Sequence, residues 1–147
     1  MSLETAAEKK SAKKKESVIP VIDIFAGPGG LGEGFTSAGF DVALSCEMDP
    51  IACETLTLRK FYHLFNVEDV PEEYYQVIKG VLKQDQLKDI HKDKYNEALN
   101  RVMCVELGDD TRRLEVHRRV HKTLEKFYNK ENFVLVGGPP CQAYSLA

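Results

Sequence analysis

Two stretches of the sequence carry residues that could do chemistry, and they lie near opposite ends of the chain. Towards the C-terminus, the apolar run from Phe133 to Val136 is followed by two glycines, two prolines and Cys141. This pattern predicts a thiol just after the carboxyl end of a buried strand, the edge at which open α/β sheets bind ligands. Pro139 and Pro140 restrict the backbone and would hold the sulfur in place against a substrate. The alternative interpretation is a buried, inert cysteine.

The second stretch is a glycine-rich turn. Val18 to Phe25 is a near-continuous apolar run, typical of a strand buried on both faces, and Gly27, Gly29 and Gly32 follow it with G-x-G-x-x-G spacing. Glu47 comes about twenty residues later, the distance at which an acid accepts hydrogen bonds from ribose hydroxyls in dinucleotide sites. The spacing alone does not separate a nicotinamide cofactor from S-adenosylmethionine.

Two apolar side chains flank this turn. Met48 follows Glu47 and is placed to lie against an adenine ring. Phe25 ends the first strand, where its ring could face the positive charge of a sulfonium. For both residues the alternative is an ordinary core side chain.

The elements that would position these residues alternate along the chain. The predicted strands are residues 18–25, 41–46, 101–107 and 132–136. Asp49 and Pro50 have the residue types that cap and begin a helix, here to about Phe61. Residues 62–100 are less regular, with a short helix after Pro71 and an amphipathic piece from Tyr95 to Leu99, and we interpret them as an insertion packed on one edge. Strands alternating with helices predict an α/β fold with a doubly wound parallel sheet.

A long helix is expected between the third and fourth strands, after a turn and cap at residues 108–111. Its predicted apolar stripe consists of Leu114, His117, Val120, Leu124 and Phe127. His117 and His121 have the i, i+4 spacing of a metal-binding pair, but no third ligand is apparent. We therefore expect no metal and a surface or half-buried position for both histidines.

Composition limits the class of protein. The chain has 147 residues, 43% of them apolar, and a net charge of -3, so it is one globular domain or part of one without a global nucleic-acid footprint. No apolar run approaches the ~18 residues of a membrane span, and the lysine-rich residues 1–17 are expected to be a disordered tail. Four cysteines without Cys-x-x-Cys spacing favour reduced thiols in a cytoplasmic protein.

Asp23 to Leu31 together with Gly138 to Ser145 resembles the cofactor motif and the catalytic Pro-Cys motif of the cytosine-5 DNA methyltransferases. The resemblance covers about residues 18–147. It implies an incomplete Rossmann-like, S-adenosylmethionine-dependent methyltransferase fold, with the target-recognition domain absent.

The resemblance implies a role for individual residues. Cys141 would be the nucleophile, and Pro140 would contribute backbone contacts to the target base. Glu106 and Leu107 would meet the adenine amino group and ring, with Asp109 as a rival for the acid. The other residues expected to bind S-adenosylmethionine are Phe25, Ala26, Gly27, Gly29, Gly30, Leu31, Glu47 and Met48.

The implied reaction adds the thiolate to C6 of cytosine so that C5 can attack the methyl group, with the base flipped out of double-stranded DNA. The family's Glu-Asn-Val and Arg-x-Arg motifs are missing, so we expect an N-terminal portion that is inactive alone and depends on C-terminal parts for DNA contacts. A bacterial restriction-modification enzyme, with or without a cognate endonuclease, fits best. The alternatives are a tRNA cytosine-5 methyltransferase, an NAD-dependent oxidoreductase and a non-catalytic binding module.

Overall fold

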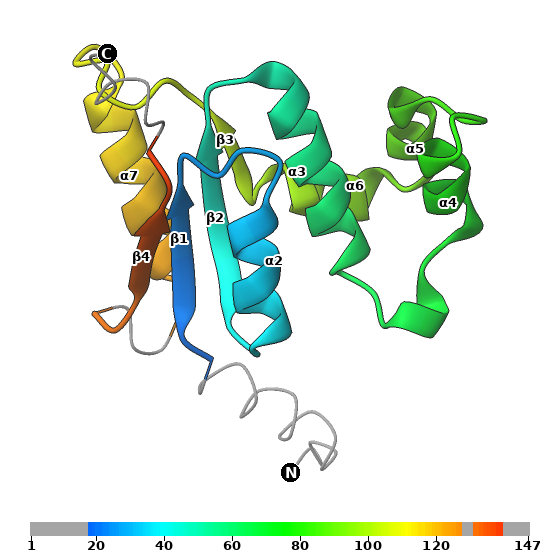
Figure 1. Ribbon diagram of the computed structural model, residues 1–147, viewed down its shortest axis with the longest axis horizontal. Coiled ribbons are helices and arrows are strands. Elements are labelled where there is room, and N and C mark those ends of the chain that lie inside the picture. The colour runs from blue at the N-terminus through cyan, green and yellow to red at the C-terminus, as the bar shows by residue number, and fades with distance from the viewer. Residues whose placement is uncertain (1–17, 128–130, 140–147) are drawn as a thin grey trace, which may run out of the picture.

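The computed structural model describes residues 18–127 and 131–139 (Figure 1). The predicted tail at residues 1–17 lies outside these ranges, as do Pro140 and Cys141. In the part of the chain that is described, no helix has the length and apolarity needed to cross a membrane.

The described strands form one parallel sheet in the order β3-β2-β1-β4. Their bounds are Pro20–Ile24 for β1, Asp41–Glu47 for β2, Val102–Cys104 for β3 and Val134–Gly137 for β4. Ile24 pairs with Cys46 on one side and with Gly137 on the other, so the carboxyl ends of β1, β2 and β4 lie together. This sheet, with helices between its strands, confirms the predicted α/β class.

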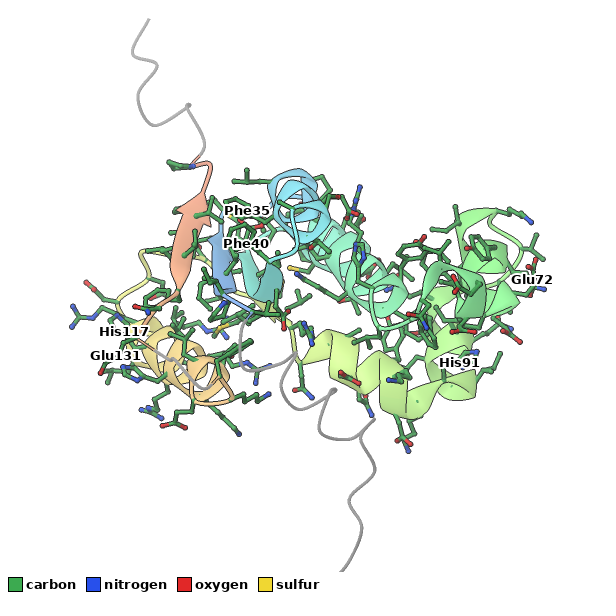
Figure 2. The ribbon with its side chains drawn as sticks, turned by 90° about the horizontal axis from the view of Figure 1, so that it is seen from below. Phe35, Phe40, Glu72, His91, His117 and Glu131 are labelled. Carbon is green, nitrogen blue, oxygen red and sulfur yellow. The ribbon has the colours of Figure 1, made fainter. Side chains whose placement is uncertain are left out.

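Helices cover both faces of the sheet. Helices α2 (Gly30–Ser37) and α3 (Pro50–Tyr62) lie on one face, and α7 (Arg113–Leu124) lies on the other, as Figure 2 shows from below the sheet, with Phe35 and His117 on opposite sides. The predicted cap of α3 is confirmed, because the carboxylate of Asp49 accepts a hydrogen bond of 2.8 Å from the amide of Ala52 and Pro50 is the first helical residue.

The core under α7 differs from the predicted stripe. Val116, Val120 and Leu124 pack on the sheet, whereas the side chain of Leu114 is 64% exposed and His117 is exposed. Residues 114 and 116 point about 200° apart on a helix, so a helix that buries Val116 turns Leu114 outward. The buried members of this core are Ile22, Leu44, Cys46, Met103, Val105 and Leu124.

The segment between α3 and β3 builds a second core of its own. It contains the 3-10 turn η1 (Val67–Asp69) and the helices α4 (Glu72–Ile78), α5 (Gln84–Ile90) and α6 (Lys92–Leu99). Phe61 at the end of α3 is fully buried against Leu87, Tyr95 and Ala98. Figure 1 shows α4 and α5 beyond α3, away from the sheet.

Two sequence predictions need correction in this region. Helix α5 was not predicted, and α6 begins at Lys92 rather than at Tyr95. The third strand was expected over residues 101–107 but is only three residues long. The last hydrogen bond between the two strands, β2 and β3, runs from the amide of Val105 to the carbonyl of Glu47 at 2.7 Å, and β2 ends at Glu47.

Charged groups are buried between the sheet and α3. Asp23 and Ser45 are register partners, and neither side chain has a hydrogen-bond partner among the described residues. Lys60 is 8% exposed and donates a hydrogen bond of 2.9 Å to the carbonyl of Val42. Burial, with a smaller contribution from Arg101, lowers the pKa of Lys60 to about 8. The carboxylates of Asp23, Asp41 and Glu33 oppose this shift.

Replacing Gly29 by alanine should destabilise the fold by about 1–3 kcal/mol. Gly29 has φ of 94°, and a Cβ there would lie 2.9 Å from Cδ2 of Leu56. Gly34→Ala is the matched control, because Gly34 lies inside α2 with nothing within 4 Å of an added Cβ, and it should stabilise by about 0.5–1 kcal/mol. Urea unfolding of both variants measures the difference, and equal effects would contradict the assignment.

Lys60→Met should raise the free energy of unfolding at pH 7, and this gain should shrink as the pH rises. The folded-state pKa of Lys60, about 8, lies below the 10.5 of an unperturbed lysine, so the parent protein gains stability between these pH values as the buried amine loses its proton. The full difference corresponds to roughly 3 kcal/mol. Unfolding curves of both proteins from pH 7 to 10.5 test this, and a constant gap would argue against it.

Candidate functional site

The glycine turn follows β1 and has a backbone conformation that few residues with side chains tolerate. Phe25 has φ of 55°, and Gly27 and Gly29 have φ of 54° and 94°. The amide of Ala26 donates to the carbonyl of Cys46 at 3.1 Å, and the amide of Gly29 donates back to Ala26 at 3.0 Å. The turn is therefore fixed to the end of β2 before α2 begins.

The carboxylate of Glu47 holds this turn from the neighbouring strand. Its Oε2 accepts a hydrogen bond from the amide of Gly27 at 2.8 Å. Its Oε1 accepts from the amides of Met48 and Asp49 at 2.8 and 2.9 Å. One side chain thus joins the end of β2, the glycine turn and the start of α3, and we call these three contacts the Glu47 clamp.

The glycines of the turn serve two different purposes. A Cβ at Gly29 would meet Leu56 and Arg59 of α3, and one at Gly32 would come within 3.1 Å of Oδ2 of Asp23, so both are needed for close packing. A Cβ at Gly27 or Gly30 would meet nothing within 4 Å. The open side of the turn therefore lies at Gly27 and Gly30, where a ligand could approach the backbone.

The apolar residues around the turn are not all core. Met48 is 61% exposed and Leu31 is 45% exposed, whereas Ala26 is buried and Phe25 is half-buried. The interpretation of Met48 as a core side chain is therefore wrong. An exposed thioether beside the Glu47 clamp leaves a surface on which a flat ring can lie.

The two candidate acids after β3 differ in their surroundings. Oδ1 of Asp109 accepts hydrogen bonds from the hydroxyl and the amide of Thr111 at 2.7 and 2.8 Å, and these bonds lower the pKa of Asp109. Glu106 is exposed and follows Val105, whose amide is bonded to Glu47. Leu107 is half-buried against the core. Asp109 is thus engaged within its own turn, while Glu106 directly follows the residue that is bonded to the backbone of Glu47.

Strand β4 ends at the same edge of the sheet as β1 and the glycine turn. Gly137 pairs with Ile24, the last residue of β1, and a Cβ at Gly137 would run into the carbonyl oxygen of Ile24. Gly138 and Pro139 follow directly and are exposed. The candidate catalytic residues Pro140 and Cys141 come next and lie outside the described residues.

Two other thiols, which the sequence did not single out, contact the clamp. Sγ of Cys53 donates to the carbonyl of Glu47 at 3.4 Å, and Sγ of Cys104 lies 3.8 Å from the carbonyl of Met48. Burial raises the pKa of Cys53 to about 12, and burial also raises that of Cys46 to about 11. Cys46 and Cys53 therefore stay protonated at neutral pH and are poor nucleophiles.

The predicted exclusion of a metal site concerned His117 and His121. Both are exposed on α7. Over residues 18–127 and 131–139, no group of three metal-ligating side chains comes together.

Comparison with known proteins gives a consistent set of relatives. The family model for C-5 cytosine-specific DNA methylases matches residues 19–81. The type II methyltransferase M.Bpa9945I of Bacillus paralicheniformis is 32% identical over 86% of this chain and 31% of its own length. M.AquIA of Picosynechococcus sp., also a type II methyltransferase, is 28% identical over 86% of this chain and 34% of its length.

A relative from an archaeon adds to this set. The putative type II methyltransferase M.MjaORF1200P of Methanocaldococcus jannaschii is 27% identical over 87% of the chain and 37% of its own length. The chain therefore spans about a third of the length of these relatives. No solved structure matches the chain. Since the family match covers the glycine turn and Glu47 and the relatives align over most of the chain, this protein belongs to the C-5 cytosine-specific DNA methylase family, as an N-terminal part of the catalytic domain.

Proposed function

We propose that the chain supplies the cofactor site and the nucleophile of an enzyme that transfers a methyl group from S-adenosylmethionine to C5 of cytosine in DNA. The observation that carries this proposal is the Glu47 clamp, which shapes the glycine turn at the edge where β4 leads towards Cys141. Family membership supports methyl transfer as the reaction class.

The site residues fit the cofactor in chemistry and in space. Gly27 and Gly30 leave the backbone open to a ligand, and Met48 offers an exposed face for adenine. Glu47 already accepts three hydrogen bonds, but a carboxylate has about four acceptor positions, so it can still accept from a ribose hydroxyl. We assign Glu106, rather than Asp109, to the adenine amino group, because Glu106 directly follows Val105, whose amide is bonded to the carbonyl of Glu47. Phe25, Ala26, Gly29, Leu31 and Leu107 complete the proposed site.

Covalent geometry supports the place of the nucleophile. Cys141 is four positions after Gly137, and four residues span at most about 14 Å. Gly137 lies beside Ile24 at the base of the glycine turn, and this short connection supports the proposal that Cys141 acts at that edge of the sheet. Pro140 would then bring backbone groups to the target base.

The proposed chemistry uses the Cys141 thiolate as the attacking group. Its sulfur bonds to C6 of a flipped-out cytosine, and the ring electrons shift so that C5 becomes enamine-like. S-adenosylmethionine supplies the methyl group, which C5 takes as the bond from the sulfonium to the methyl carbon breaks. Loss of the C5 proton and expulsion of the thiolate then restore the aromatic ring.

The remainder of the domain would dock beside β4. Among the described residues no strand pairs with the outer edge of β4, and Leu135 and Phe133 are 60% and 40% exposed there. We propose that residues 18–147 form the N-terminal portion of the domain, with residues 62–100 as an insertion, and that further polypeptide completes the sheet and reads the DNA sequence. Alone, the chain should not turn over.

Relatives named type II methyltransferases favour a restriction-modification setting, in which a cognate endonuclease is a natural partner.

Glu47→Gln should weaken S-adenosylmethionine binding about tenfold. The NH2 group of glutamine would face one of the backbone N–H groups that now donate to the carboxylate. The lost hydrogen bond would cost about 1–2 kcal/mol. Glu54→Gln, on the exposed face of α3, is the control and should bind normally. Calorimetric titration with S-adenosylmethionine, and with NAD in parallel, measures both. Tighter binding of NAD would favour an oxidoreductase instead.

Cys141→Ser should abolish the covalent complex with duplex DNA that carries 5-fluorocytosine at the target position. Fluorine at C5 cannot leave as a proton does, so the adduct is trapped in the parent enzyme. Cys104→Ser, which alters an exposed thiol at the same end of the sheet, should still form it. Intact-mass measurement on the complete protein with S-adenosylmethionine gives the readout. An adduct in the Cys141 variant would contradict the assignment, and preference for a tRNA substrate would shift it to RNA.

A further inference from the structure

A basic groove runs along the outer edge of the sheet, far from β4. It has a volume of about 430 Å³ and lies between β3 and α7. We call it the β3–α7 groove. Its lining consists of Val102, Met103, Cys104, Arg112, Glu115, Arg118, Arg119 and Lys122. Four cationic side chains thus face one carboxylate, in a chain whose net charge is -3.

The single carboxylate of the groove is already neutralised. Arg112 donates from Nε and Nη2 to the two oxygens of Glu115, both at 2.9 Å. Arg119 donates from Nη2 to the carbonyl of Asn100 at 3.0 Å, a bond that leaves its charge uncompensated. In the described part of the chain, no ion pair involves Arg118, Arg119 or Lys122. Three positive charges therefore remain available to an anion.

These cations are distributed along the groove. Arg112 reaches the carbonyl of Cys104 at the carboxyl end of β3, and Arg119 bonds to Asn100, just before the strand begins. The three available cations, Arg118, Arg119 and Lys122, lie within about one helical turn, or about 6 Å, which corresponds to roughly two phosphates along one strand of B-DNA. Three charges over this length suit neighbouring phosphates of a linear polyanion better than one small anion.

We propose that the β3–α7 groove binds the phosphate backbone of duplex DNA next to the target site, without reading sequence. The partner class rests on the proposed function, since a DNA-modifying enzyme meets this polyanion. β3 lies three strands from β4, about 14 Å across the sheet, so the groove would contact phosphates several base pairs from the flipped cytosine. Such contacts position the enzyme on the duplex and strengthen binding in low salt.

The test uses Arg118→Glu/Lys122→Glu and a labelled duplex that contains only A·T pairs. Lys88→Glu/Lys92→Glu, at exposed positions of α5 and α6, carries the same change of charge away from the groove. Fluorescence anisotropy over a range of salt concentrations should show at least tenfold weaker binding for the groove variant. Its log–log salt slope should be shallower by about 2, close to 0.9 for each lost phosphate contact. The control should change the slope little.

A second pair, Arg118→Gln/Lys122→Gln, removes the charges without adding repulsion and should give a smaller loss of the same kind. Thermal unfolding midpoints close to the parent's show that the variants fold. Equal losses in groove and control variants, or no binding by the parent chain, would overturn the proposal, as would tighter binding of an A·U RNA duplex through the same residues. Because the duplex has no cytosine and needs no cofactor, this result is independent of the titration and adduct experiments that test the methyltransferase function.

Discussion

The three hydrogen bonds of the Glu47 clamp are the constraint on which the rest of the structure depends. A single carboxylate sets the path of the glycine turn, the exit from β2 and the entry to α3. Backbone amides at a turn need an acceptor, and an anionic oxygen is a stronger acceptor than a neutral one. The same group that would bind a ribose is therefore also the group that builds the surface around it. In the proposed site, binding and local folding would share one side chain, and that side chain already shapes the turn without a ligand.

Much of this arrangement could be predicted because its signals are local. Asp49 followed by Pro50 specifies the start of α3 through bonds that span only three residues. The apolar run that forms β1 is buried on both faces, and Glu47 occupies the end of the next strand as its spacing indicated. These features depend on neighbours in the sequence or on a short β-turn-α-β unit. Tertiary context does not alter them.

The predictions that were wrong or left open depend instead on contacts between residues distant in the sequence. Helix α5 buries Leu87 alone, so it has no apolar stripe and is held by contacts with α3 and α6 that the sequence does not display. The predicted stripe on α7 was right at Val120 and Leu124 but wrong at Leu114 and His117, because contact with the sheet selects Val116 instead. The proposed choice of Glu106 over Asp109 rests on the hydrogen bond between Val105 and Glu47, which the sequence does not display. The residues that decide each case are distant in the chain or differ only in their hydrogen bonds.

Helix α3 contacts the glycine-turn region at its first end and the second core at its other end. Its N-cap residue, Asp49, donates its amide to the Glu47 clamp, whereas its last turn buries Phe61 in the second core. Substitutions or changes of length in the helices that surround Phe61 therefore act at the opposite end of α3 from the Glu47 clamp. That outlying layer can therefore vary as a separate module while the hydrogen bonds of the clamp stay as they are.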